Sequence, residues 1–378
     1  MRLLTLLITT AAGIGLTHAA WTRHTIDGPD PASGKSGADG VRLADANNDG
    51  LMDITTGWEQ GGAVRVYLNP GPADAKKSWP AVTVGSVVGV EDAVFADLDN
   101  DGALDVVSST EGKNNTLYVH WAPASPDDYL NPDAWSTEPF PQTARAQRWM
   151  FCLPLNVDDL NGIDLVLGSK SNKAAVGWLE SPPNPRDLDA WKYHRLQDAG
   201  WIMSIRNASP ENAGAPSIVY SDRKGPATGV YRLHGKNPPL SKKDTLLTET
   251  DDELLFLDIV SSQNSPPQVY VPRRIGPIIT PDGDLARPET AGAGKAVSVG
   301  HINLDDKLDL VLTCGLAKDN LSGVWWHDGE TWHDISGPEG VKFDRVELLD
   351  LDADGDLDVL TCEESANLGV IWYENPHR

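Results

Sequence analysis

The chain has 378 residues, with 55 acidic against 31 basic side chains and a formal net charge of −24. A chain this acidic does not attract polyphosphates, which argues against nucleic acid as a partner. Its three cysteines are too few for a disulfide framework, and its length allows two or three ordinary domains or one large repeat fold.

The first twenty residues have the features of a secretory signal peptide. Arg2 supplies one positive charge, a short apolar run follows, and small residues up to Ala20 precede Trp21. Polar residues and glycine interrupt the apolar run, so it is too short for a membrane anchor, and no other segment could cross a bilayer. We expect a signal peptide at 1–20 and a secreted or periplasmic, monomeric domain at 21–378.

Three stretches share the pattern Asp-x-(Asp/Asn)-x-Asp-Gly-x-x-Asp, at residues 45–53, 97–105 and 350–358. Oxygen side chains at this spacing, with glycine for a sharp turn, suit a hard cation, and calcium fits best. Strand-forming residues follow at once, where an EF-hand would enter a helix, so each loop is expected to join two strands. The candidate ligands of three structural calcium ions are Asp45, Asn47, Asp49 and Asp53, then Asp97, Asp99, Asp101 and Asp105, then Asp350, Asp352, Asp354 and Asp358.

These loops are the clearest copies of a unit of about fifty residues. Degenerate copies occur at 156–167 and 301–312, and two units without a usable loop lie around 205–220 and 254–271. Four short strands per unit, seven units and almost no helical periodicity predict an all-β, seven-bladed β-propeller, with the calcium loops in the hairpins between first and second strands. The fourth strand often opens on tryptophan, as at Trp79, Trp135, Trp191 and Trp332.

The two ends of the chain predict how the ring closes. The last unit stops after its third strand, which ends at Trp372-Tyr-Glu-Asn-Pro. Residues 21–26 resemble the fourth strand at 191–196, so the N-terminal strand can complete the last blade and remove an open sheet edge. An open β-solenoid, the competing fold, has no need for this match.

The loops and their repeat resemble the FG-GAP and VCBS repeat families, which include the integrin α-subunit propeller. The resemblance implies a seven-bladed propeller with calcium in its hairpins. It implies little about activity, because members include adhesins, lectin-like modules and propellers within carbohydrate-active enzymes. A weaker similarity is to the propeller of aldos-2-ulose dehydratase, a sugar-modifying enzyme, although no motif in the chain establishes that link.

The cysteines lie in or beside apolar, strand-like segments. Cys314 and Cys362 follow equivalent strands in neighbouring units, which leaves either a disulfide or two free thiols open. Cys152 is expected to be a core residue.

Propeller topology places the starts of the first strands and the loops between second and third strands on the face opposite the calcium hairpins, where propellers usually bind ligands. Arginine pairs there suit carboxylate or sulfate groups, and tryptophan faces suit sugar rings. The alternative is that the charges are merely solvated and the tryptophans plug the channel. The candidate ligand residues are Glu59, Glu111, Arg148, Trp149, Lys170, Trp201, Asp222, Arg223, Lys224, Arg273, Arg274 and Glu363.

Three functions fit this sequence, which has no Ser-His-Asp set, zinc-protease motif or phosphate loop. The first is binding of a polar or acidic carbohydrate, or another small polar ligand, at the channel mouth. The second is a lyase or dehydratase at the same place, because a basic residue beside Glu59, Glu111 or Glu363 could supply both a base and a charge partner. The third is an adhesion or protein-interaction propeller.

Overall fold

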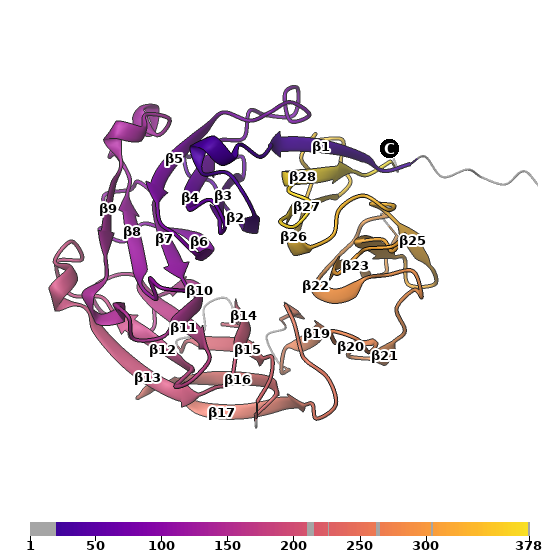
Figure 1. Ribbon diagram of the computed structural model, residues 1–378. Coiled ribbons are helices and arrows are strands. Elements are labelled where there is room, and N and C mark those ends of the chain that lie inside the picture. The colour runs from indigo at the N-terminus through magenta and orange to yellow at the C-terminus, as the bar shows by residue number, and fades with distance from the viewer. Residues whose placement is uncertain (1–19, 210–214, 226, 262–264, 304, 377–378) are drawn as a thin grey trace, which may run out of the picture.

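The repeating unit predicted from the sequence is a four-stranded antiparallel blade, and seven such blades surround a central axis (Figure 1). The computed structural model describes residues 20–209, 215–225, 227–261, 265–303 and 305–376. The predicted signal peptide therefore lies outside the described residues, apart from Ala20. The prediction of a seven-bladed propeller is confirmed.

In each blade the four strands follow one another from the axis outward. They are β2 (Ala38–Ala44), β3 (Asp53–Trp58), β4 (Ala63–Tyr67) and β5 (Ala81–Ser86); β6 (Val90–Ala96), β7 (Asp105–Thr110), β8 (Leu117–Trp121) and β9 (Ser136–Pro139); β10 (Arg148–Leu155), β11 (Asp164–Lys170), β12 (Ala175–Glu180) and β13 (Lys192–Asp198); β14 (Ile202–Asn207), β15 (Ser217–Asp222), β16 (Gly229–Lys236) and β17 (Pro239–Thr248); β18 (Asp258–Val260), β19 (Gln268–Pro272), β20 (Ile278–Thr280) and β21 (Gly283–Leu285); β22 (Ala293–Gly300), β23 (Asp309–Gly315), β24 (Val324–His327) and β25 (Trp332–Asp334); and β26 (Phe343–Leu349), β27 (Asp358–Glu363), β28 (Gly369–Glu374) and β1 (Thr22–Asp27). Short 3-10 helices occur in the connections, at η1 (Pro31–Ser33), η2 (Pro126–Asp128), η3 (Pro132–Ala134), η4 (Pro141–Thr143) and η5 (Leu188–Ala190).

The N-terminal strand closes the ring, as predicted. Strand β1 pairs antiparallel with β28, placing His24 opposite Trp372 (Figure 1). Ile26 is 1% exposed and packs in a core cluster shared by the last and first blades. The Ile26 carbonyl also accepts a hydrogen bond from the Trp79 backbone N–H, at 3.1 Å. The closing strand is thus tied to both blades at the joint.

The second strands of most blades are buried on both faces. In β3, β7, β11, β15 and β27 every residue is buried, because each sheet packs face to face against its two neighbours. Gly168 in β11 shows how closely blades approach. A Cβ at this position would lie 2.4 Å from the Ile202 side chain of the next blade. Outer strands such as β13 contain only exposed and half-buried residues instead.

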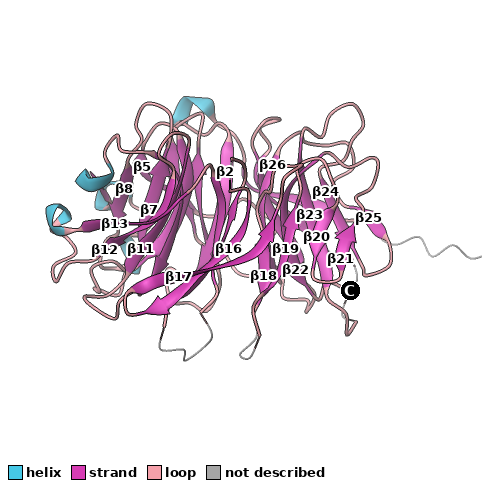
Figure 2. Cartoon of the chain, turned by 90° about the horizontal axis from the view of Figure 1, so that it is seen from below, coloured by secondary structure: helices cyan, strands magenta, loops and turns pink. Residues whose placement is uncertain are grey.

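Two faces of the ring have different connections. The first strands start on what we call the mouth face and run to the hairpin face, where the loops between first and second strands lie (Figure 2). The loops between second and third strands return to the mouth face. The predicted calcium loops and the predicted ligand segments therefore occupy opposite faces.

The cysteine question left open by the sequence has a clear answer. Cys152, Cys314 and Cys362 are all buried free thiols, so Cys314 and Cys362 do not pair. Burial also raises the pKa of the Cys314 thiol to about 12, which keeps it protonated and unreactive. Within the described residues, none of the helices has the length and hydropathy needed to cross a membrane.

Truncating the closing strand should destabilise the whole ring. We expect Ile26→Ala to lower the free energy of unfolding by about 2–5 kcal/mol, because it leaves a cavity at the joint between the last and first blades. Chemical denaturation followed by tryptophan fluorescence measures this loss. Thr22→Ala, at an exposed position of the same strand, is the control and should change stability by no more than about 0.5 kcal/mol. Equal stability of the two variants would contradict the role of β1 in closure.

Candidate functional site at the channel mouth

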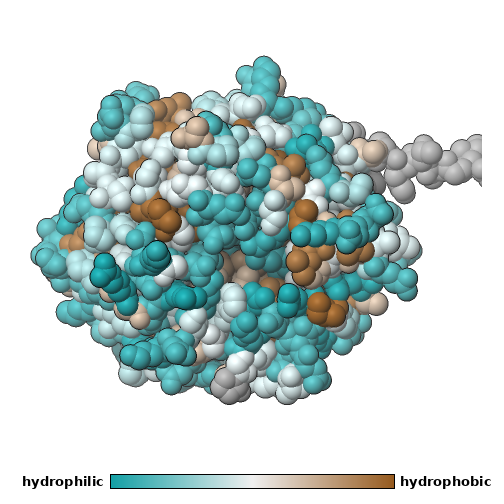
Figure 3. Space-filling model, viewed as in Figure 1, coloured by the Kyte–Doolittle hydropathy of each residue, from teal (hydrophilic) through white to brown (hydrophobic). Residues whose placement is uncertain are grey.

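A cavity of about 360 Å³ opens at the centre of the mouth face, and we call it the mouth pocket. Its lining comes from all seven blades, from the starts of first strands and the loops between second and third strands. Figure 3 shows a hollow near the middle of this face, ringed mainly by hydrophilic residues. The structure thus brings together the segments that propeller topology predicted.

The structure divides the twelve candidate ligand residues into two groups. Six of them line the mouth pocket: Glu59, Glu111, Lys170, Trp201, Arg223 and Arg274. The other six lie beside the pocket or support the loops around it. Ligand binding by the first group remains a prediction.

Three of the remaining six residues form hydrogen bonds with backbone groups. Trp149 is buried between blades, where its indole N–H donates to the Thr143 carbonyl at 3.0 Å. Asp222 accepts the backbone N–H of Trp201 at 2.8 Å and so positions that residue. Glu363 is fully buried and accepts several backbone N–H groups of the adjoining loops. These three residues do not reach the pocket.

The other three are cations outside the lining. Arg273 forms ion pairs with Glu249 at 2.5 Å and Asp284 at 3.0 Å, which direct it away from the axis. Arg148 is exposed at the start of β10. Lys224 lies at the pocket edge, with its ammonium 4.5 Å from the Trp201 ring centroid.

Bulges in the first strands explain why strand alternation did not predict these directions. In six of the seven blades the pairing of first and second strands shifts register near the mouth end. In β10 the shift falls between Trp149 and Phe151. A one-residue shift exchanges the faces of the following side chains. Trp149 therefore points between blades while Phe151 lines the pocket.

Blades three to five give the pocket an apolar wall that the sequence analysis missed. Met150, Phe151, Met203, Leu255 and Phe256 line it and are all buried. The Phe151 and Phe256 rings meet edge to face, with centroids 5.2 Å apart. The available signal was a pair of apolar residues at or just before the start of each of these first strands.

Beside this apolar wall lies a basic wall, formed by Arg223, Lys224 and Arg274. All three form ion pairs with the single carboxylate of Glu253, at 2.6, 3.6 and 3.8 Å respectively. The Arg223 guanidinium also stacks 4.3 Å from the Trp201 ring centroid. Burial opposes the charge of Glu253, but Arg223 outweighs it and holds the pKa of this carboxyl below its usual value. Three positive charges thus share one negative charge.

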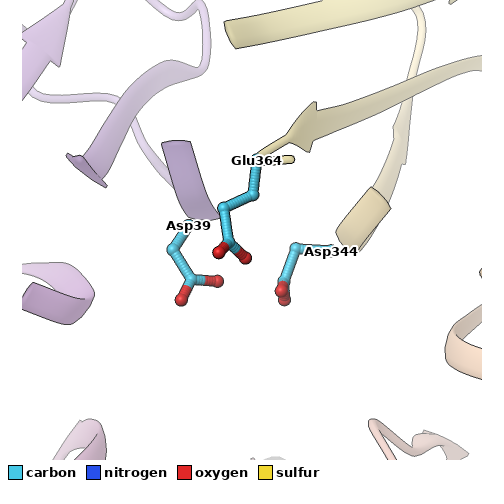
Figure 4. A group of neighbouring side chains, drawn as sticks. All are labelled: Asp39, Asp344 and Glu364. Atoms are coloured by element: carbon cyan, nitrogen blue, oxygen red, sulfur yellow. The ribbon is translucent and has the colours of Figure 1, made fainter. Parts of the chain in front are cut away.

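Blades one and seven contribute a group of three carboxyls that point toward one another (Figure 4). Asp39, Asp344 and Glu364 are buried, and their oxygens lie within 4.8 Å of one another. Lys295 pairs with Asp344 at 2.9 Å, and Lys342 pairs with Glu364. Burial and the nearby Asp344 raise the pKa of Asp39 well above its usual value. Two ammonium groups compensate two of the carboxylates, and the raised pKa of Asp39 favours its protonated form.

Blades one and two contribute a second cluster of three acidic side chains, which lies around Lys170. The oxygens of Glu59, Glu91 and Glu111 lie within 4.8 Å of one another, and Lys170 pairs with Glu91 at 3.4 Å and with Glu111. Burial raises the pKa of Glu91 to about 8. Burial also opposes the charge of Glu111, but its hydrogen bond from Lys170 holds the pKa of Glu111 below the usual value. We call these two clusters of acidic side chains together the carboxyl wall.

Two of the three predicted calcium loops bring carboxylate oxygens close together. Oxygens of Asp97, Asp99 and Asp101 lie within 4.8 Å of one another, as do those of Asp350, Asp352 and Asp358. Asp97 Oδ1 and Asp352 Oδ1 are buried and accept no hydrogen bond from the described residues. Such oxygen-only sets with an unsatisfied buried oxygen fit a hard divalent cation. In the loop at 45–53 the ligand side chains hydrogen-bond to the loop itself.

The last aspartate of each loop also has a role that needs no metal. Its carboxylate accepts the backbone N–H of the second loop residue and, in four of the blades, an N–H just beyond the third strand, at 2.8–3.2 Å. The degenerate loops of blades three and six keep this residue, which in blade six holds only the loop. The aspartates are Asp53, Asp105, Asp164, Asp309 and Asp358.

The unusual pKa of Glu91 should make stability depend on pH. The folded protein holds the Glu91 proton up to about pH 8, whereas the unfolded chain loses it near the ordinary value of 4.5. The folded state therefore binds more protons between these values, and stability falls as pH rises through this window. We expect Glu91→Gln to raise the melting temperature relative to the native protein more at pH 9 than at pH 5. A difference that stays constant between pH 5 and pH 9 would contradict the burial of an ionisable Glu91.

Comparison with known proteins supports the repeat and the fold. Residues 45–108 match the model of the FG-GAP-like repeat family. BBS1N, solved in complex with ARL6DN, superposes with a TM-score of 0.52 at 11% identity, covering 93% of this chain and 96% of that one. The corresponding values are 0.53, 10%, 93% and 60% for a chain of the S. cerevisiae core factor, and 0.50, 8%, 94% and 94% for the Dos1 propeller.

These similarities establish the fold alone, because all the identities are low. The sequence matches no curated protein. The similarity to aldos-2-ulose dehydratase is not shown by these comparisons. The chain is therefore a seven-bladed β-propeller that carries an FG-GAP-like repeat at residues 45–108.

Proposed function

We propose that this protein is an exported, calcium-stabilised propeller that binds a polar or acidic carbohydrate in the mouth pocket. The observation that carries the proposal is the composition of the pocket: one apolar wall adjoins walls of charged side chains held in ion pairs. The cavity of about 360 Å³ falls within the range of roughly 300–1,000 Å³ usual for small-molecule sites.

A sugar ring matches this composition. It has apolar C–H surfaces, which pack against aromatic and aliphatic side chains such as Trp201 and Phe256. Its hydroxyl groups both donate and accept hydrogen bonds, which the ammonium and carboxyl groups of the carboxyl wall can reciprocate. A purely apolar ligand would leave those buried charges without solvent, at a high cost in free energy.

Calcium belongs to the proposal because of the ligand chemistry of the hairpin loops. The loops at 97–105 and 350–358 hold clustered carboxylates that repel one another without a cation. Basic side chains of neighbouring blades offset only part of this charge, with Arg186 on Asp99 and Lys76 on Asp352. Calcium is abundant outside cells, which agrees with export by the predicted signal peptide.

Protein docking is the second candidate, and three exposed apolar residues on the mouth face favour it. Val88, Ile275 and Leu316 are 72%, 64% and 53% exposed, and all lie on mouth-face loops. The similar propeller BBS1N is itself described in complex with ARL6DN. Such docking would cover the mouth pocket rather than fill it.

A glycan array probed with the calcium-loaded protein tests the first candidate. We expect binding to a subset of glycans, and we expect Trp201→Ala to weaken it roughly two- to tenfold because an aromatic contact is lost. Trp332→Ala, on the outer edge of blade six, is the control and should bind normally. Absence of binding to every glycan would refute carbohydrate recognition. An unsaturated sugar released from a bound glycan would instead reveal the lyase or dehydratase.

Removing calcium should lower stability. Saturation at about one hundred times the dissociation constant stabilises the folded state by about 2.7 kcal/mol per site. We therefore expect EDTA to lower the melting temperature by several degrees, and calcium but not magnesium to restore it. Asp352→Asn should reduce this response, whereas Asp159→Asn, exposed in the degenerate loop of blade three, should not. An unchanged melting temperature in EDTA would contradict structural calcium.

A further inference from the structure

We infer that the basic wall is a subsite for an anionic group, so that the mouth pocket selects acidic over neutral sugars and binds them in one orientation. The inference rests on the proposed function and extends it. The anionic group is a carboxylate or a sulfate, since both are recognised by the same paired, charge-assisted hydrogen bonds.

The basic wall carries more positive than negative charge. Arg223, Lys224 and Arg274 share Glu253, which leaves an excess of positive charge in a protein whose net charge is −24. Elsewhere around the pocket the order is reversed, because carboxyls outnumber the lysines that pair with them. The basic wall is therefore a favourable place for an anionic ligand group to bind.

The three cations of the basic wall differ in how exposed they are to an incoming ligand. Arg223 is 16% exposed and holds Glu253 through two nitrogens, at 2.9 and 2.6 Å. Lys224 and Arg274 are 50% and 42% exposed, and their distances to Glu253 are longer. Arg223 thus fixes the carboxylate and the wall, while Lys224 and Arg274 are available to an incoming anion.

The rest of the ligand would lie against the apolar wall and the carboxyl wall. With its acidic group on Lys224 and Arg274, a sugar ring would extend over Trp201 and the apolar wall, because these surfaces adjoin within the pocket. Its far hydroxyls would then face the carboxyl wall. The raised pKa values of the Asp39 and Glu91 carboxyls favour their protonated forms, which can donate to those hydroxyls. The two charged walls therefore define a head and a tail for the ligand.

The test uses the calcium-loaded full chain on an array carrying neutral, uronate-containing and sulfated glycans. We expect binding to the acidic classes only, weakened by raising the salt concentration because the cations are exposed. The uronate and sulfate arms identify which anion is preferred. Equal binding of neutral and acidic glycans would overturn this inference and leave the proposed function standing. No binding at all would overturn both.

Variants of the basic wall make the test specific. The double variant Lys224→Gln, Arg274→Gln should bind acidic glycans about tenfold more weakly, the loss expected for charge-assisted hydrogen bonds. Glu253→Gln should bind them more tightly, because it removes the carboxylate that competes for the cations. Lys113→Gln, exposed on the same face but outside the lining, should change nothing. An equal loss in Lys113→Gln would reduce the effect to general surface charge and refute the subsite.

Discussion

The pairing of β1 with β28 is the constraint on which the rest of the structure depends. Seven blades packed face to face form a closed ring only if the last sheet receives its fourth strand, and that strand comes from the opposite end of the chain. The mouth pocket takes residues from all seven blades, so it exists only in the closed ring. Closure also fixes which side chains face the axis, because each blade is held by both neighbours.

The ring brings charged residues together at a cost that stability alone does not explain. Buried ion pairs such as Lys295 with Asp344 repay their desolvation only partly, and apolar residues of similar size would serve a core as well. Pairs of carboxyls whose pKa values are pushed apart, as at Glu91 and Glu111, are typical of functional sites. The concentration of such groups around one cavity is the main reason to locate function at the mouth face.

In the hairpin loops, one residue shapes the fold independently of metal binding. The last aspartate of each loop bonds to backbone N–H groups, so it shapes the hairpin whether or not a cation is bound. Blades three and six keep this aspartate although their loops depart from the full pattern, with Gly162 one place late in blade three and His301 at the first position in blade six. Loss of a complete metal loop therefore need not cost a blade its hairpin. Blades three to five, which lack intact loops, contribute the apolar and basic walls.

The sequence by itself determined the number of blades, the order of strands, the closing strand and the two faces, because these follow from local patterns of apolar residues and turns. It also placed Lys170, Trp201, Arg223 and Arg274 at the mouth. Only the tertiary structure separated Arg223 from Arg273, turned Trp149 away from the axis and revealed the apolar wall. The physical reason is that bulges near the mouth reset the alternation of side chains, and that ion partners such as Glu253 and Glu249 come from distant parts of the chain.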